Sequence, residues 1–261
     1  MSARLPVRPA APIADGMKLH RRRLRLGGRN HTVITLRPGT DARFSTNYFH
    51  DTWHVLSDWR GARLLGRLLW GLAFQRVPGT LVVIDLPFVD PNPFDASPGD
   101  PIVLIPSRLT PWSAAAARDL RRRLPLHGPG DGTVRWHTHG LDRLVAAGHK
   151  WQRLPTREWM DRVHGMVTFA AADALLRAHA YGVFTLGVGA RHGMDYTDLA
   201  WQDGEVQVFS DYRARVSAAR AARAQVLGGR ALTPEAERLL WERGTAIRTA
   251  MARSHGAPVR A

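Results

Sequence analysis

The chain of 261 residues contains no cysteine, and only two of its basic residues are lysines, Lys18 and Lys150. The absence of cysteine excludes disulfide bonds, cysteine-ligated zinc and a thiol nucleophile. Arginine supplies 35 of the 37 basic side chains, and alanine and glycine are frequent, a combination typical of a GC-rich genome. Such a bias explains arginine in place of lysine, but it does not explain the excess of basic over acidic residues.

The sequence also lacks a long uninterrupted apolar run. The first thirty residues contain no apolar stretch of signal-peptide type. The longest apolar stretch, 166–188, is interrupted by Asp173, Arg177 and His179, so it predicts a buried helix and strand rather than a membrane span. We therefore expect a cytoplasmic protein without a membrane partner.

Two signature motifs of enzymes are missing as well. No GxxxxGK[ST] sequence is present, which excludes a conventional P-loop ATPase, and no GxSxG nucleophile elbow is present. The apolar fraction of 44% is nevertheless that of an ordinary globular chain.

The net charge of +15 is unevenly distributed. Residues 1–43 carry ten basic and two acidic side chains, and residues 210–261 carry ten and four, whereas 44–209 carry seventeen and sixteen. This layout predicts a neutral folded body whose basic ends bind a polyanion. The expected partner is DNA or RNA. The alternative is a solvated basic surface that serves solubility alone.

Six arginines at the two ends are the candidate nucleic-acid contacts: Arg21, Arg22, Arg23, Arg25, Arg213 and Arg220. The first four lie in a segment, 1–30, that has the character of a basic arm. That arm reads as a phosphate-binding tail or as a disordered leader. Leucines alternate with its arginines, which also allows a short ordered strand.

Hydrophobic periodicity predicts an α/β fold: a three-layer, mostly parallel sheet core over 31–209, followed by a basic helical hairpin over 210–261. The expected strands are 32–36, 81–86, 102–105, 134–138, 184–188 and 205–209. The expected helices are 46–75, in two pieces that meet near Gly61, then 111–124, 141–147, 156–179, 211–227 and 234–253.

A second function, a metal-dependent hydrolase or nuclease, is indicated by Asp85, His137 and His139. Asp85 ends a buried strand, and the two histidines share one face at the end of another. If these strands are neighbours, the three side chains converge where open α/β sheets bind ligands. A divalent metal ion is the cofactor that this alternative would use. The simpler interpretation is that the strand before His137 and His139 is an edge strand with one solvent-exposed face.

His50 and His54 form a further candidate metal site. In the predicted helix they lie one turn apart on one ridge, and Asp58 follows after another turn. Two imidazoles in this arrangement can bind one metal ion. The competing interpretation, which we favour, is a polar helix face beside an aromatic core.

Overall fold

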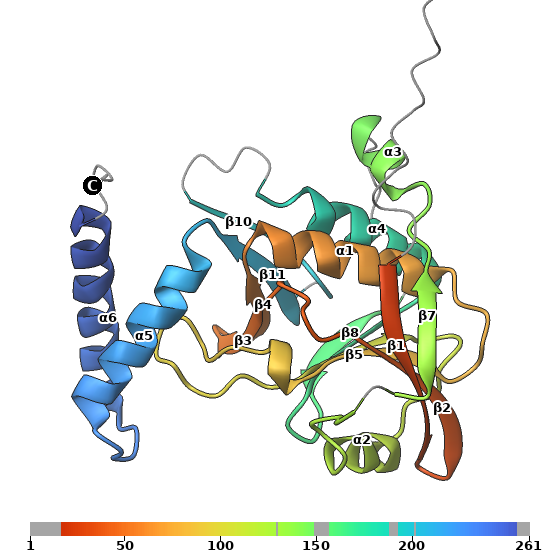
Figure 1. Ribbon diagram of the computed structural model, residues 1–261, viewed down its shortest axis with the longest axis horizontal. Helices are drawn as coiled ribbons and strands as arrows, with labels where there is room; N and C mark the ends of the chain where they lie inside the picture. The colour runs from red at the N-terminus through yellow and green to blue at the C-terminus, as the bar shows by residue number, and fades with distance from the viewer. Residues whose placement is uncertain (1–16, 129, 149–156, 188–192, 201, 255–261) are drawn as a thin grey trace, which may run out of the picture.

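Two β-sheets and six α-helices make up the described part of the chain (Figure 1). The structure is a computed structural model that describes residues 17–128, 130–148, 157–187, 193–200 and 202–254. The seven-stranded sheet has the order β7–β1–β2–β5–β6–β9–β8, with β1 at Met17–Leu26, β2 at Arg29–Thr35, β5 at Thr80–Ile84, β6 at Ile102–Pro106, β7 at Gly132–Trp136, β8 at Trp159–Arg162 and β9 at Val167–Ala171. The four-stranded sheet has the order β10–β11–β4–β3, with β3 at Phe44–Phe49, β4 at Thr52–Ser57, β10 at Met194–Asp198 and β11 at Gly204–Phe209.

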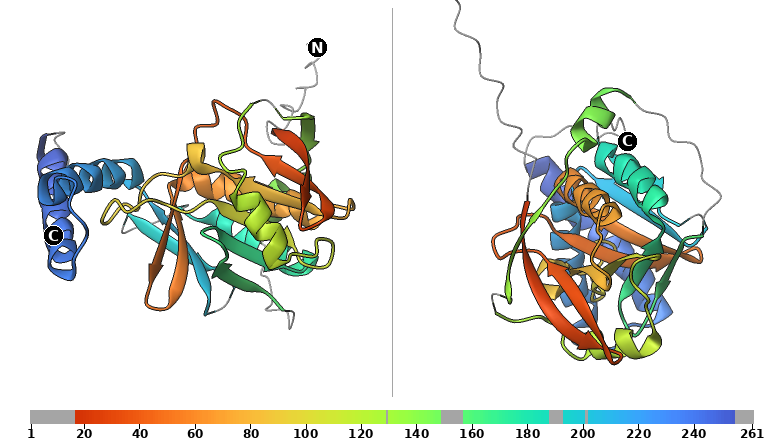
Figure 2. Two further views of the ribbon diagram at one scale, coloured as in Figure 1. Left: turned by 90° about the horizontal axis from the view of Figure 1, so that it is seen from below. Right: turned by 90° about the vertical axis from the view of Figure 1, so that its right-hand side faces the viewer.

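The helices are α1 at Trp59–Ala73, α2 at Ala114–Arg121, α3 at Leu141–Ala146, α4 at Asp173–Thr185, α5 at Tyr212–Leu227 and α6 at Pro234–Ser254, with a 3-10 turn at Leu86–Phe88. One helix, α2, packs on one face of the seven-stranded sheet, and α1 and α4 pack on the other (Figure 2). One core lies between α2 and the sheet, where Leu120 packs near Val33 and Val103. A larger core lies on the other face and joins α1 and α4 to both sheets.

The prediction of an α/β fold is confirmed, but the sheets are mixed and not mostly parallel as predicted. Six of the nine strand pairings among the described residues are antiparallel and three are parallel. Short turns explain part of the difference, because a two-residue connection can only join antiparallel neighbours. Gly27 and Gly28 make such a turn between β1 and β2, with φ of 55° and 79°.

The basic segment near the N-terminus is a strand where the structure describes it. Residues 17–26 form β1, which pairs with β2 on one side and β7 on the other. Residues 1–16 of the predicted arm lie outside the described part. The alternation of leucine and arginine is therefore that of a strand whose two sides pack against different cores. Leu19 faces the α1 core, and Leu24 and Leu26 face the α2 core.

The predicted helix over 46–75 is wrong in its first half. Residues 44–57 form the hairpin of β3 and β4, and only α1 is helical. His50 and Asp51 take positive φ values of 51° and 58° in the turn. Asp58 is the N-cap of α1, and its carboxylate accepts hydrogen bonds from the backbone N–H groups of Arg60 and Gly61.

The predicted helix over 156–179 is wrong in its first part, and the predicted strand over 184–188 begins inside α4; residues 156 and 188 lie outside the described part. The hairpin of β8 and β9 occupies the first part, and α4 starts only at Asp173. His164 and Gly165 turn the chain with φ of 51° and 73°, a geometry that no helix contains. The strand β10 was not predicted.

The two C-terminal helices project from one end of the molecule as a pair (Figure 1). Leu227 of α5 and Leu240 of α6 pack together in a small core of their own. The pair joins the body at Tyr212, whose buried hydroxyl lies 2.7 Å from the hydroxyl of Ser45 on β3. No helix in the described ranges has the length and apolar character that a bilayer crossing requires.

Candidate functional site

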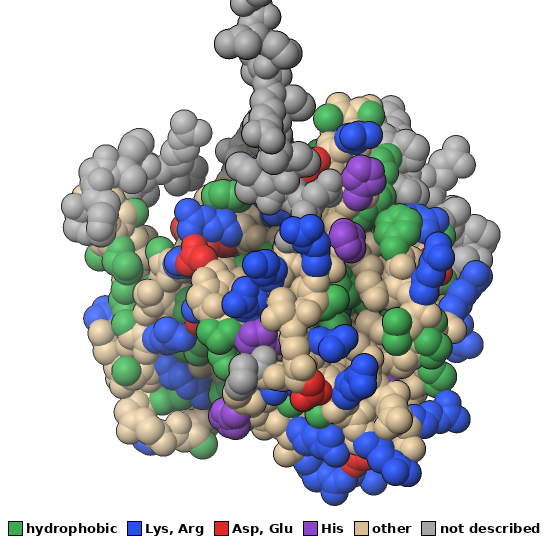
Figure 3. Space-filling view, turned by 45° about the vertical axis from the view of Figure 1, so that its right-hand side comes forward, with side chains coloured by type: hydrophobic (Ala, Val, Ile, Leu, Met, Phe, Trp, Pro, Cys, Tyr) green, Lys and Arg blue, Asp and Glu red, His purple; other side chains and the backbone are tan. Residues whose placement is uncertain are grey.

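The excess positive charge gathers on one unit of the fold, made of β1, β2, β7 and α2. Its two segments, 17–37 and 114–135, carry twelve basic and two acidic side chains. We call this unit the cationic face. Figure 3 shows Lys and Arg side chains spread over this side of the molecule with few carboxylates between them.

The loop that joins β1 to β2 is fastened to α2. The backbone N–H of Gly27 donates to the carboxylate of Asp119 at 2.8 Å. A Cβ at Gly27 would lie 2.9 Å from the backbone nitrogen of Ala116, so the turn and the helix approach too closely for a larger residue. Ser113 caps α2 by accepting a hydrogen bond from the Ala116 N–H. These contacts hold the hairpin and the helix together as one unit, in which Arg23 and Arg25 point to the side of β1 opposite Leu24, Leu26 and α2.

Both carboxylates of the cationic face are engaged within it. Asp119 accepts from Gly27 and pairs with Arg122, and Asp131 accepts from the backbone N–H of Arg23. Eight exposed basic side chains on the face form no ion pair with any residue that the structure describes: Lys18, Arg23, Arg25, Arg29, Arg37, Arg118, Arg123 and Arg135. Their charge is therefore available to an external anion.

A pocket of about 330 Å³ opens beside this face. It lies where the parallel strands β2 and β5 end, and its wall includes His20 and Arg22 from β1, Asp85, Arg43 and His127. Two arginines and two histidines thus surround one carboxylate. The Asp85 carboxylate is 4% exposed and accepts hydrogen bonds from the backbone N–H groups of Leu86 and Leu126.

Arg22 builds the wall of this pocket. Its guanidinium donates to the backbone carbonyls of Leu126, His127 and Gly128, at 2.9 Å for His127. The Nε of Arg22 is buried and has no partner in the described structure. The arginine therefore fixes the 126–128 loop while its charge stays at the pocket.

His20 is 9% exposed, and its ring forms no hydrogen bond with a described residue. Burial lowers the pKa of His20 from its ordinary value, and the charges of Arg37 and Arg22 lower it further. The imidazole is therefore neutral near pH 7. The same two arginines that disfavour its proton make the surroundings favourable to an anion.

The structure does not bring Asp85, His137 and His139 together. The strands β5 and β7 that precede them are separated by β1 and β2. Three strand spacings of about 4.8 Å place the two strands roughly 14 Å apart. Both histidines are exposed, and the backbone carbonyl of His139 accepts a hydrogen bond from Trp70. Asp85 instead shares a pocket with His20 and His127.

His50 and His54 do not share a helix ridge, because that segment is a hairpin. His50 lies in the exposed turn, whereas His54 is buried in β4 with its Nε2 3.6 Å from a carboxylate oxygen of Glu205. Burial lowers the pKa of His54, and Glu205 opposes this shift. Within the described ranges, no group of three or more histidine and acidic side chains is arranged to hold a metal ion.

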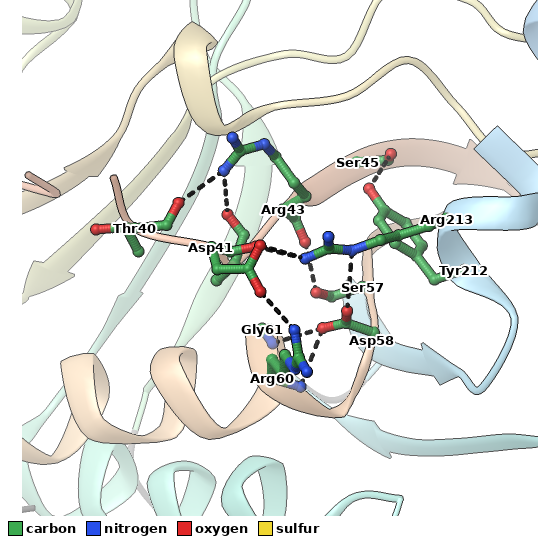
Figure 4. Close-up of polar contacts among 11 residues, drawn as sticks. Thr40, Asp41, Arg43, Ser45, Ser57, Asp58, Arg60, Gly61, Tyr212 and Arg213 are labelled. Carbon is green, nitrogen blue, oxygen red and sulfur yellow. Dashed lines mark hydrogen bonds and ion pairs between the residues drawn. The ribbon is translucent and has the colours of Figure 1, made fainter. Parts of the chain in front are cut away.

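Of the six predicted nucleic-acid contacts, the four on β1 belong to the cationic face. Arg23 and Arg25 are exposed, and Arg21 and Arg22 are partly buried. The two on α5 are held by the body: Arg213 pairs with Asp41 and Asp58, and Arg220 pairs with Asp90 at 3.1 Å (Figure 4 shows the Arg213 pairs).

No known family, curated protein or solved structure matches the chain.

Sequence reasoning missed several residues of this site, above all His20, Arg43 and His127. The arginines of α2 lie in the predicted helix over 111–124, and nothing in the sequence connects them to the basic run on β1. The one available signal was the spacing of His20 and Arg22, which places both on one face of a strand. Nothing in the sequence pairs His20 with His127, because the fold alone brings β1 to the loop after α2.

Proposed function

We propose that this protein binds nucleic acid, and that the cationic face is its binding surface. The observation that carries the proposal is the set of eight exposed basic side chains on one unit of the fold that form no ion pair with a described residue. Each arginine or lysine that meets a phosphate releases a counterion, which supplies most of the affinity of sequence-independent binding.

The dimensions of the face fit a nucleic-acid backbone. The ten residues of β1 extend roughly 34 Å at about 3.4 Å per residue, which is the length of about one turn of B-form duplex. Arg23 and Arg25 share one side of this strand and can contact neighbouring phosphates, and Arg29 extends the positive charge around the hairpin turn. The partner is DNA or RNA, and we keep the cytoplasm as the expected location.

The proposed binding surface does not include the C-terminal helices α5 and α6. The α5 arginines serve to hold the helix pair to the body, since Arg213, Arg220 and Arg223 contact Asp41, Asp90 and the backbone carbonyl of Asp95. Each of these guanidinium groups already has a carboxylate or carbonyl partner, so it offers a phosphate less than an arginine without one does.

A metal-dependent hydrolase centred on Asp85, His137 and His139 has weaker support. Asp85 lies on a different strand from the histidines, with two strands between, and both of its oxygens accept backbone hydrogen bonds. A carboxylate committed in this way positions the 126–128 loop rather than a metal ion.

A fluorescence anisotropy titration tests the proposal with labelled single- and double-stranded DNA and RNA and the full chain. If about six phosphates are contacted, affinity falls by roughly 1,000-fold between about 50 and about 200 mM salt. Little preference for sequence is expected, because phosphate contacts carry no sequence information. Absence of binding at the lower salt concentration would refute the proposal and leave the charge as a solubility feature.

A further inference from the structure

We propose that the pocket formed by His20, Arg22, Arg43, Asp85 and His127 binds a phosphate monoester, namely the terminal phosphate of a nucleic-acid strand. The inference rests on the proposed function, because it makes the pocket the place where a strand bound on the cationic face ends.

The position of the pocket favours a ligand. It opens at the carboxyl ends of β2 and β5, which are parallel, and ligands in α/β sheets bind at such ends. Its volume of about 330 Å³ lies at the small end of the range for ligand sites. A phosphate with part of its sugar fits a space of this size.

The charge of the pocket selects an anion. Arg22 and Arg43 contribute two permanent positive charges, and Arg37 is close enough to lower the pKa of His20. Among the described residues of the wall, Asp85 is the only carboxylate, and two backbone N–H groups already donate to it, which reduces its repulsion of a second anion.

The wall of the pocket contains hydrogen-bond donors that have no partner among the described residues. Arg43 donates from Nη1 to the backbone carbonyls of Thr40 and Ala42, and its guanidinium lies over the ring of Phe88. Its Nη2 and Nε bind no other described residue. The ring of His20, nine-tenths buried, also has no partner there. An arginine edge and an imidazole that share one pocket can donate to the oxygens of one phosphate.

Burial decides between a terminal and an internal phosphate. An internal phosphate carries chain on both sides and stays at the surface, where Arg23, Arg25 and Arg29 are exposed. A terminal phosphate has three oxygens and a single substituent, so it can enter a recess walled by His20 and Asp85, which are both buried. The exposed face therefore binds the internal phosphates of the strand, and the recess binds its terminal phosphate.

The test is a titration of matched oligonucleotides that carry a 5′-phosphate, a 3′-phosphate or neither, at one salt concentration. The full chain is compared with His20→Asn, Arg43→Gln and the surface variant Arg25→Gln/Arg29→Gln. Circular dichroism melts check that each variant is folded, and Arg43→Gln keeps the test valid if His20→Asn does not fold.

We expect one phosphorylated strand to bind about tenfold more tightly than the unphosphorylated strand, since two charge-assisted hydrogen bonds are gained. Arg43→Gln should remove this preference and leave binding of the unphosphorylated strand unchanged. The Arg25→Gln/Arg29→Gln variant should weaken binding of all strands and keep the preference.

Equal affinities for all three strands would overturn the inference while the proposed function stands. A preference that survives both pocket variants would overturn it as well, because the phosphate would then be held elsewhere. Failure of every strand to bind would refute the proposed function itself, and the identity of the pocket's ligand with it.

Discussion

Arg213 on α5 binds Asp41 in the loop before β3: its Nη2 donates to the carboxylate at 2.8 Å and to the backbone carbonyl of the same residue at 2.7 Å (Figure 4). Arg60 approaches the same carboxylate from α1. An arginine that the sequence offered as a phosphate contact thus joins the helix pair to the body. The eight exposed basic side chains of the cationic face lie on the other side of the fold.

The Asp41 pair predicts a dependence of stability on pH. Hydrogen bonds from Arg213, and then from Arg60, hold the pKa of Asp41 below its usual value. A carboxylate whose pKa is lower in the folded state contributes stability above its unfolded pKa of about 3.9 and loses it as the pH falls through the folded value. Asp41→Asn should therefore lower the thermal midpoint slightly at pH 7, and the difference from the wild type should vanish in strong acid.

Asp203→Asn is a suitable control for that experiment, because Asp203 is exposed in the turn between β10 and β11. Its thermal midpoint should follow the wild type at every pH. A difference between Asp41→Asn and the wild type that stays constant down to pH 2 would argue against the pair.

The hydrogen bond between Ser45 and Tyr212 predicts an asymmetric effect of two substitutions. In Tyr212→Phe, Ser45 still donates to the backbone carbonyl of Pro91 at 2.8 Å, so the loss should be about 1 kcal/mol. In Ser45→Ala, the buried Tyr212 hydroxyl loses its partner and Pro91 its donor, so the loss should be about 2 to 3 kcal/mol. Chemical denaturation measures both, and a larger loss for Tyr212→Phe would contradict this arrangement.

Two helical glycines should respond in opposite directions to the same substitution. A Cβ at Gly71 in α1 would lie 2.1 Å from the indole nitrogen of Trp136, so Gly71→Ala should cost about 1 to 3 kcal/mol through overpacking. A Cβ at Gly244 in α6 would make only ordinary contacts at 3.9 Å or more, so Gly244→Ala should stabilise by about 0.5 to 1 kcal/mol. The thermal midpoints of the two variants, compared with that of the wild type, test this prediction. Destabilisation by both substitutions would show that α6 is packed differently.

Local signals predicted the elements that local physics controls. The apolar runs at β5 and β6 and the Thr233–Pro234 start of α6 were visible in the sequence, and the Thr233 hydroxyl indeed accepts a hydrogen bond from the N–H of Ala236. The hairpin of β3 and β4 was missed because Phe49, Trp53 and Leu56 happen to repeat at a helical spacing. Their aromatic and β-branched neighbours favour strands, and the turn at His50 has no glycine to mark it.

The candidate site was predictable only in part, because it is assembled from distant segments. The arginines of β1 stood out as a charged run, and they do form part of the cationic face. Their true neighbours did not stand out: Arg22 binds the carbonyl of His127, 105 residues away. Whether an arginine is free or paired depends on contacts of this kind, as Arg213 shows, and composition cannot distinguish the two.

The most direct test of the account is the salt dependence of nucleic-acid binding in two variants of equal charge. Arg25→Gln/Arg29→Gln removes two arginines from the cationic face, and Arg238→Gln/Arg253→Gln removes two from α6, at the other end of the molecule (Figure 1). On duplex DNA, the first variant should reduce the slope of log affinity against log salt by about 1.8, since each lost phosphate contact removes about 0.9. The second should leave the slope unchanged. Equal reductions in the two variants, or a reduction confined to the α6 variant, would contradict the assignment of the binding surface to β1, β2 and α2.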